Sequence, residues 1–187
     1  MRVIGLAGWS GAGKTTLLLK LIPELARRGV TVSTVKHAHH GFEVDHPGKD
    51  SHAHRAAGAQ EVLVASSGRW VLMRELRGAP EPRLAEHLAR LSPVDLVIVE
   101  GFKGEAHPKI AVHRAANGKP LIVPELDAVR AVASDEPLPG LSLPVIPLDD
   151  AAAIASACLD HAEPCDALIA QLAVTPPRPR LKPPPQA

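Results

Sequence analysis

A glycine-rich loop between a strand and a helix constrains the fold of this chain more than any other feature. Residues 8–15 read G-W-S-G-A-G-K-T, which matches the pattern G-x-x-x-x-G-K-[ST] at every fixed position. The apolar residues 2–7 predict a buried strand before the loop, and residues 16–28 have the apolar spacing of a helix. The alternating, β-branched residues 30–35 predict a second strand. This βαβ unit indicates an α/β fold of the P-loop NTPase type, a three-layer αβα arrangement around a mostly parallel sheet.

The loop itself predicts a binding site for a polyphosphate. Its glycines let backbone N–H groups turn towards the anion, and the N-terminus of the following helix adds positive potential. Lys14 is expected to reach the β- and γ-phosphates and to act in catalysis, while the Thr15 hydroxyl is expected to ligate Mg²⁺. Thr16 is placed for the α-phosphate. The expected cofactor-binding residues of the loop are Gly11, Ala12, Gly13, Lys14, Thr15 and Thr16.

A second carboxylate for the metal is expected at the end of a neighbouring apolar strand, within D-L-V-I-V-E-G at residues 95–101. Asp95 stands at the start of this strand, roughly 15 Å from the edge where parallel sheets bind ligands. Glu100 stands at the correct end and is followed by Gly101, which lets the chain turn close to the phosphates. We therefore assign Glu100 to the metal or its water, with a solvated strand end as the alternative.

The rest of the chain predicts a hairpin and a series of short elements. Residues 61–65 and 69–76 flank Ser66-Ser67-Gly68, which is typical of a β-hairpin at the edge of the sheet. Residues 36–60 are polar and predict irregular structure. The further expected elements are helices at 83–91, at 151–159 (capped by Asp149 and Asp150) and at 165–172, and strands at 94–99, 110–113, 121–123, 129–133 and 145–146.

Composition limits the class of protein and the number of domains. The 187 residues are 45% hydrophobic and 22% charged, with a net charge of +1, unlike a dedicated nucleic-acid binder. No apolar run approaches the about 20 residues of a membrane helix, so a cytoplasmic protein without membrane or nucleic-acid partners is expected. Residues 1–173 are predicted to form one nucleotide-binding domain. Residues 174–187 contain six prolines and three basic residues, which predicts a disordered tail.

A histidine-rich segment follows the second predicted strand, on the same rim as the glycine-rich loop. Six of the ten histidines lie between His37 and His54. Asp45, Lys49 and Asp50 indicate a switch-type loop that orders around γ-phosphate and Mg²⁺. A transition-metal site and a plain solvated loop are the two alternatives.

Three pieces of the chain together resemble the family of molybdopterin-guanine dinucleotide biosynthesis protein B (MobB). They are G-W-S-G-A-G-K-T-T at 8–16, V-K-H-A-H-H-G-F-E-V-D-H-P-G-K-D-S-H-A-H-R-A-A-G-A at 35–59 and D-L-V-I-V-E-G-F-K at 95–103, and H-P-K-I-A-V-H-R follows at 107–114. The resemblance implies a dimeric P-loop protein that binds GTP and hydrolyses it weakly. It also implies an adapter role beside a MobA-like guanylyltransferase, which attaches GMP to molybdopterin. By the same resemblance, Asp45 and Glu100 lie near Mg²⁺ and the γ-phosphate, as catalytic and metal residues.

Recognition of the base is less well defined by the residues. The chain has no N-K-x-D sequence, and Asp135 either accepts hydrogen bonds from guanine N1 and N2 or caps a helix. Two other functions fit parts of the pattern. One is a GTPase that delivers Ni²⁺ or Zn²⁺ through the histidine-rich segment. The other is a small-molecule kinase, although Arg83 and Arg90 lie on a plain amphipathic helix where a kinase needs an arginine-rich lid.

Overall fold

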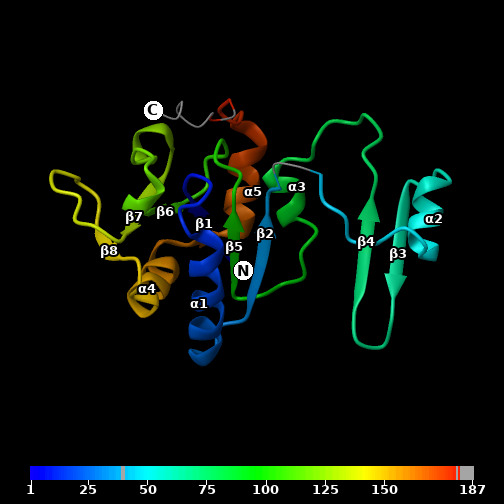
Figure 1. Cartoon of the computed structure of the whole chain (residues 1–187), viewed down its shortest axis with the longest axis horizontal. Helices are drawn as coiled ribbons and strands as arrows, with labels where there is room; N and C mark the ends of the chain where they lie inside the picture. Colours follow the sequence, from blue (N-terminus) through cyan, green and yellow to red (C-terminus); the bar gives the residue numbers. More distant parts are fainter. Residues whose placement is uncertain (39–40, 180, 182–187) are drawn as a thin grey trace. The chain divides into compact units, whose positions relative to one another are not determined.

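The computed structural model describes residues 1–38, 41–179 and 181 (Figure 1). The chain divides into two compact units. The first joins Met1–His37 to Arg83–Ala187, and the second is Ala38–Pro82. Within the described residues, no helix is long and apolar enough to cross a membrane.

The first unit is built on a seven-stranded sheet with the order β2-β5-β1-β6-β7-β8, in which all neighbours run parallel. A short strand, β9, adds to β1 in the antiparallel direction. The predicted mostly parallel α/β sheet is therefore confirmed. The strands are β1 (Arg2–Ala7), β2 (Val32–Lys36), β5 (Leu96–Glu100), β6 (Lys109–His113), β7 (Val129–Ser134), β8 (Val145–Pro147) and β9 (Glu163–Pro164).

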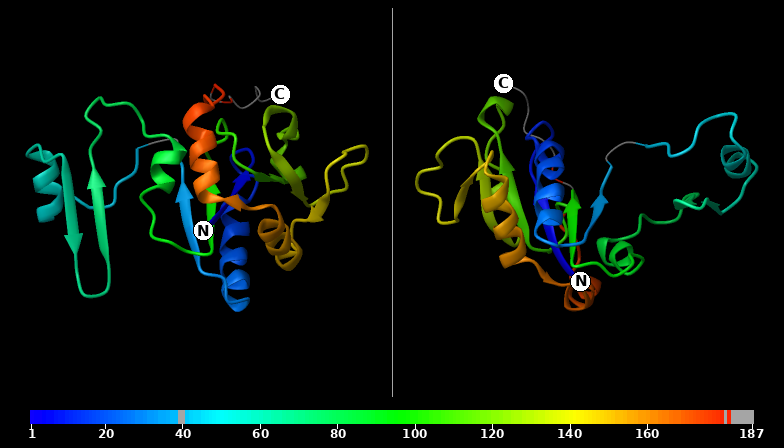
Figure 2. Two further views of the ribbon diagram at one scale, coloured as in Figure 1. Left: turned by 180° about the vertical axis from the view of Figure 1, so that it is seen from behind. Right: turned by 90° about the horizontal axis from the view of Figure 1, so that it is seen from below.

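Helices cover both faces of this sheet, because alternate residues of each strand point to opposite sides. One face, with Ile4 and Ile98, packs against α1 (Lys14–Arg27) and α4 (Ala151–His161), which lie next to each other in Figure 1. The other face, with Val3 and Val97, packs against α3 (Leu84–Leu88) and α5 (Cys165–Val174), seen in the left view of Figure 2. The result is the expected three-layer arrangement.

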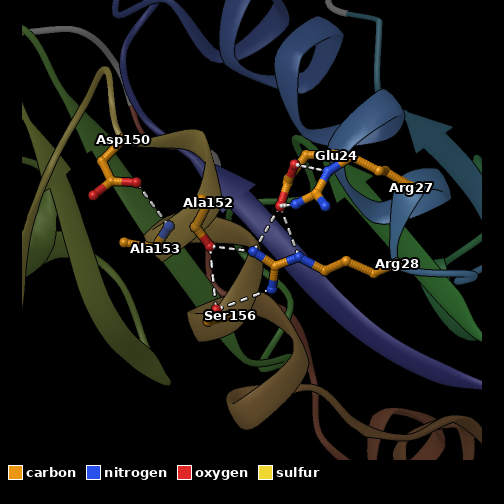
Figure 3. A network of polar contacts seen from close by, with 7 residues as sticks. All are labelled: Glu24, Arg27, Arg28, Asp150, Ala152, Ala153 and Ser156. Atoms are coloured by element: carbon orange, nitrogen blue, oxygen red, sulfur yellow. Dashed lines mark hydrogen bonds and ion pairs between the residues drawn. The ribbon is translucent and has the colours of Figure 1, made fainter.

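A polar network fixes α1 against α4 (Figure 3). Arg28, at the end of α1, donates to Glu24 Oε1 at 2.8 Å and to the carbonyl oxygen of Ala152 at 2.8 Å. Asp150 accepts from the Ala153 N–H at 2.9 Å, which confirms the predicted cap of α4. Because α1 carries the glycine-rich loop at its other end, this network helps to hold the loop in place.

The strand expected at residues 121–123 is wrong. The segment instead leads into a 3-10 helix, Val123–Glu125, whose first turn contains Pro124. Ile122 and Leu126 are buried with Ala111 and Val132, so this loop covers the second face of the sheet beside the α3–α5 layer. This segment has the apolar residues typical of a strand because they pack against a face of the sheet.

The second unit contains α2 (Asp50–Ala56) and a two-stranded antiparallel sheet of β3 (Glu61–Ala65) and β4 (Trp70–Arg74). The predicted hairpin is thus present, but its expected place at the edge of the main sheet is wrong, because β3 and β4 form a two-stranded sheet of their own. The turn is closed by a hydrogen bond from the Ser66 N–H to the Arg69 carbonyl oxygen at 2.8 Å. The expectation of wholly irregular structure over 36–60 is wrong, because α2 forms there. This helix has only seven residues, about two turns, and its mixed polarity leaves little periodic signal.

The chain beyond α5 contacts the first unit. The Thr175 carbonyl oxygen accepts from Arg83 Nη2 at 2.6 Å, and the Arg178 N–H donates to the Gly104 carbonyl oxygen at 2.8 Å. Arg178 also pairs with Asp127 at 2.6 Å. Residues 180 and 182–187 lie outside the described part of the chain. The domain boundary at 173 and the disorder of the tail stay predictions.

Candidate functional site

The loop at residues 8–13 joins the carboxyl end of β1 to α1 and has the backbone shape that its motif requires. Gly11 and Gly13 have φ angles of +87° and +90°, in the left-handed region that favours glycine. A Cβ at Gly11 would lie 2.6 Å from Oδ1 of Asn117, so the segment after β6 packs closely on the loop here. The N-cap of α1 is Gly13, and no side chain caps the helix, which leaves the N–H groups of its first turn available to an anion.

Lys14 crosses this loop. Its Nζ donates to the carbonyl oxygens of Gly8 at 3.1 Å and Trp9 at 3.0 Å. Burial lowers the pKa of Lys14 below its ordinary value, against the opposing effect of the Glu100 carboxylate, and the neighbouring Lys36 and Lys119 lower it further. An anion bound at the loop would therefore be stabilised by the Lys14 cation, whose neighbouring negative charge is Glu100.

Thr15 and Glu100, the two residues expected to share a metal, lie together. The Thr15 hydroxyl donates to Glu100 Oε1 at 3.1 Å, and Glu100 is only 8% exposed. Lys36 Nζ lies 3.8 Å from the other carboxylate oxygen. Asp95, at the opposite end of β5, instead accepts from the N–H and hydroxyl of Thr31, at 2.8 and 2.6 Å, which agrees with its interpretation as a strand-start residue.

Two further lysines stand beside the loop and have no role in the sequence interpretation. Lys103 Nζ lies 4.9 Å from the centre of the Trp9 ring, within cation–π range. Burial, together with Lys14 and Lys119, lowers the pKa of Lys103 to about 8. Lys119 Nζ donates to the carbonyl oxygen of Ser10 at 3.1 Å. Lys14, Lys103 and Lys119 thus form a cationic cluster suited to a polyanion.

The segments after β6 and β7 approach the other flank of the loop. Arg114, directly after β6, places Nη2 3.2 Å from the position that a Cβ on Gly13 would take. Its Nη1 lies 3.5 Å from Oδ2 of Asp135, the residue directly after β7. Asp135 Oδ1 accepts from the Ala115 N–H at 2.8 Å, at the start of the 3-10 helix Ala115–Asn117. The capping role considered for Asp135 is therefore present, and its contact with guanine stays a prediction.

A small recess opens at this flank. Its lining residues are Gly13, Thr16, Leu17, Lys20, Arg114 and Leu148. Thr16, predicted to meet the α-phosphate, faces this recess from the first turns of α1, whereas Ala12 is buried in the loop.

Asp45 belongs to the second unit and lies in a separate network. Arg55, on α2, contacts Asp45 and also pairs with Glu75 at 2.6 Å and Glu43 at 3.1 Å. Asp45 is buried, and its second carboxylate oxygen has no hydrogen-bond partner among the described atoms. Asp50 is the first residue of α2, where a carboxylate favours the helix N-terminus. The approach of Asp45 to Mg²⁺ stays a prediction.

Comparison with known proteins decides the family. The model of the family "MobB: Molybdopterin guanine dinucleotide synthesis protein B" matches residues 3–135. The chain belongs to the MobB family. It is 48% identical over 140 residues to the "Molybdopterin-guanine dinucleotide biosynthesis adapter protein" of Haemophilus influenzae, with 73% of this chain and 76% of that protein covered. A protein of the same name from Escherichia coli K12 is 43% identical over 158 residues, with coverage of 82% and 89%.

Solved structures agree with this assignment. The crystal structure of a MobB homolog from Bacillus stearothermophilus has a TM-score of 0.63 and 31% identity, over 84% of this chain and 95% of that one. The resemblance to MobB and the P-loop fold are therefore confirmed. The region matched by the MobB family contains the loop, Glu100, Lys103 and Arg114, and it ends at Asp135.

The MobB-like pieces of the sequence contain the residues whose roles were missed. Lys103 ends D-L-V-I-V-E-G-F-K, and Arg114 ends H-P-K-I-A-V-H-R. Each follows a predicted strand at its carboxyl end, the edge where parallel sheets bind ligands. A position just after the carboxyl end of a predicted strand is thus the signal by which Lys103 and Arg114 could have been identified from the sequence.

The residues behind the two alternative functions have structural contacts of their own. Arg83 pairs with Glu105 at 2.8 Å, and Arg90 donates to the Glu86 carbonyl oxygen at 2.7 Å. Within the described residues, no group of three or more His, Cys, Asp or Glu side chains is placed to hold a metal ion. His39 and His40, part of the histidine-rich segment, lie outside those residues.

Proposed function

We propose that this MobB-family chain is a GTP-binding adapter protein in the biosynthesis of molybdopterin guanine dinucleotide, with weak Mg²⁺-dependent GTPase activity. The observation that carries the proposal is the 3.1 Å contact between the Thr15 hydroxyl, at the end of the P-loop, and the buried Glu100 carboxylate. A hydroxyl on the phosphate loop and an acid on the adjacent strand are the pair that holds Mg²⁺ in P-loop NTPases. The names of the Haemophilus and Escherichia relatives support the adapter role.

The phosphate chain is proposed to lie along the loop. The N–H groups of residues 11–16 cradle it, Lys14 turns from its carbonyl partners to the β- and γ-phosphates, and Thr16 donates to the α-phosphate. Oxygen donors of Thr15 and Glu100 fit Mg²⁺, which prefers such ligands and supplies charge neutralisation at the γ-phosphate. Asp45, from the second unit, is proposed as a further ligand or as a link through a metal-bound water.

Slow hydrolysis follows from the residues around the loop. Within the described part of the chain, the side chains that contact the loop or its lysines are mainly cations, with Glu100 as the buried acid. Glu100 is committed to Thr15 and the metal, so it is a poor general base for water. A site that binds the triphosphate well and activates water weakly suits an adapter whose nucleotide state organises a partner. MobA-like guanylyltransferase and molybdopterin are the proposed partners, in the cytoplasm.

A homodimer is proposed as the working form. The β3–β4 hairpin exposes several large apolar side chains, and Trp70 alone is 68% exposed. An isolated two-stranded hairpin is marginally stable in water, and a contiguous exposed apolar surface commonly marks an interface. The exposed apolar residues Leu63, Trp70 and Leu72 share one face of the hairpin, and Val64 lies on the other.

Competition between GTP and ATP tests the proposal. Purified protein with Mg²⁺ is expected to prefer GTP, to hydrolyse it slowly, and to bind a MobA-like guanylyltransferase in pull-down or calorimetry more tightly in one nucleotide state. A preference for ATP would reject the GTP assignment. Equal binding of the guanylyltransferase with and without nucleotide would reject the nucleotide-dependent adapter role.

A further inference from the structure

The order of the strands orients the nucleotide, on the basis of the proposed function. Glu100 ends β5, on one side of β1, so the metal and the γ-phosphate lie over that side. Thr15, which contacts Glu100, is followed by Thr16, which faces the recess on the opposite flank. The α-phosphate and the nucleoside therefore extend over the carboxyl ends of β6, β7 and β8.

Three residues stand at those strand ends. Arg114 follows β6, Asp135 follows β7 and Leu148 follows β8, and the first and last of these line the recess beside Gly13. Leu148 lines the recess with a side chain that is only 6% exposed, so it adds a small aliphatic surface for a base in a chain with two Trp, two Phe and no Tyr. Arg114 and Asp135 are the charged groups that could meet the polar edge of the base.

The contacts of Arg114 leave its donors available. Its side chain is 40% exposed, and that of Asp135 is 30% exposed. Its ionic partner among the described residues is Asp135, at 3.5 Å, which is longer than an ordinary hydrogen bond. A guanidinium has five N–H donors, so Arg114 can keep Asp135 as a neighbour and still donate to a ligand.

We propose that Arg114 and Asp135 read guanine as a pair, with Arg114 as a specificity residue. Guanine presents the acceptors O6 and N7 on one edge and the donors N1–H and N2–H beside them. A guanidinium donates to O6 and N7, as arginine does when it recognises guanine in DNA, while the Asp135 carboxylate accepts from N1–H and N2–H. Adenine places an amino donor where guanine has O6, so that donor would face the Arg114 donors without an acceptor.

The pairing of Arg114 with Asp135 would also let the chain recognise guanine without an N-K-x-D motif. In this arrangement the acid comes from the end of β7, and the donor comes from the end of β6, far apart in the sequence. The close packing of the 114–117 segment on Gly11 and Gly13 places the donor beside the phosphate loop. If Arg114 had only a structural role, that role would be to keep the Asp135 carboxylate in its hydrogen bond with the Ala115 N–H.

The test measures the affinities of GTP, ITP and ATP for the full chain and for Arg114→Met, with Lys20→Met as the matched control. Lys20 is an exposed cation that lines the same recess, so this variant removes a nearby positive charge and leaves Arg114 and Asp135 in place. Arg114→Met is expected to lose about 10- to 100-fold of GTP affinity, because a good bidentate contact discriminates by about that factor. ITP keeps O6 and N7 and should weaken equally, whereas ATP affinity should stay within about twofold. Lys20→Met should keep the wild-type ratio.

Several outcomes would overturn the inference. Equal losses of GTP and ATP affinity in Arg114→Met would place Arg114 on a phosphate, and unchanged affinities for both nucleotides would leave it a structural role only. Retained ATP binding shows that the variant is folded, and circular dichroism checks this independently. If the wild-type chain does not prefer GTP, the proposed function itself fails, which the wild-type measurement alone reveals.

Discussion

The two ends of the candidate nucleotide site are built differently. At the metal end, Glu100 is 8% exposed, lies on a central strand of the sheet and is already hydrogen-bonded to Thr15. At the nucleoside end, Arg114 and Asp135 are 40% and 30% exposed and stand in the loops just beyond the ends of the interior strands β6 and β7. The metal end is held by the core, whereas the nucleoside end is held by surface contacts. A change at the metal end should therefore affect chemistry and every nucleotide alike, and a change at the nucleoside end should affect selectivity.

Lys14→Ala should have the largest effect, because Lys14 serves the phosphates, which every nucleoside triphosphate shares. Removing one partner of a close charge pair commonly costs about 2–5 kcal/mol, so GTP and ATP should both lose about 100-fold or more of their affinity. Lys14 is half-buried in a surface loop, and the variant should remain folded. Fluorescent-nucleotide titration measures the loss, and thermal unfolding with Lys20→Ala as control checks the fold. A Lys14→Ala variant that binds GTP as tightly as the wild type would contradict the assignment.

Glu100→Gln should affect hydrolysis more than binding. The amide can still accept from the Thr15 hydroxyl, but it has no charge with which to hold Mg²⁺. We expect Mg²⁺-dependent GTP hydrolysis to slow by about 10- to 100-fold, with the affinity for GTP without Mg²⁺ nearly unchanged. Phosphate-release assays with and without Mg²⁺ measure both quantities. An unchanged rate would move the metal role to Asp45 or Asp50.

The difference between the two ends also explains what the sequence could predict. The phosphate loop and Glu100 are local: a motif of eight residues and one apolar strand define them. Arg114 and Lys103 acquire their positions only when β6 and β5 are placed beside β1, and no short motif contains that information. The fold was predictable because the strands and helices around β1 have clear periodicity. The loop at 121–126 was not predictable, since apolar residues that cover a sheet face look like strand residues. The short α2 was not either, since it buries none of its residues and so has no apolar periodicity.

Lys103 gives a pH-dependent test of the cationic cluster. Its pKa is lowered to about 8, so its positive charge decreases as the pH rises from 7 to 9. GTP affinity should fall over that range, and Lys103→Met should bind GTP about tenfold more weakly at pH 7, with less change at higher pH. Lys103→Arg keeps its charge throughout and should retain affinity at pH 9. An identical pH profile in all three proteins would show that Lys103 does not contact the nucleotide.

Lys109 connects the segments that lead to the two ends. It is fully buried, and its Nζ donates to the carbonyl oxygens of His107 at 2.8 Å and Asp127 at 3.4 Å. His107 lies on the connection from Glu100 to β6, and Asp127 lies just before β7, which Asp135 directly follows. Burial lowers the pKa of Lys109 to about 8, so the folded protein holds this proton less tightly than the unfolded chain does.

This difference predicts the smallest effect and its sign. Between pH 7 and 8.5 the unfolded chain keeps the Lys109 proton while the folded protein loses it, so the free energy of unfolding should rise with pH. A folded pKa of about 8 corresponds to a gain of about 1 kcal/mol over that range. Urea unfolding of the wild type and Lys109→Met at both pH values isolates this contribution, because both proteins share Lys14, Lys103 and the two cysteines. Lys109→Met should lack about 1 kcal/mol of the pH-dependent gain. If the free energies of unfolding of the two proteins change equally with pH, the buried Lys109 amine stays charged over this range. Its hydrogen bonds to the carbonyl oxygens would then be its only contribution to joining the two ends.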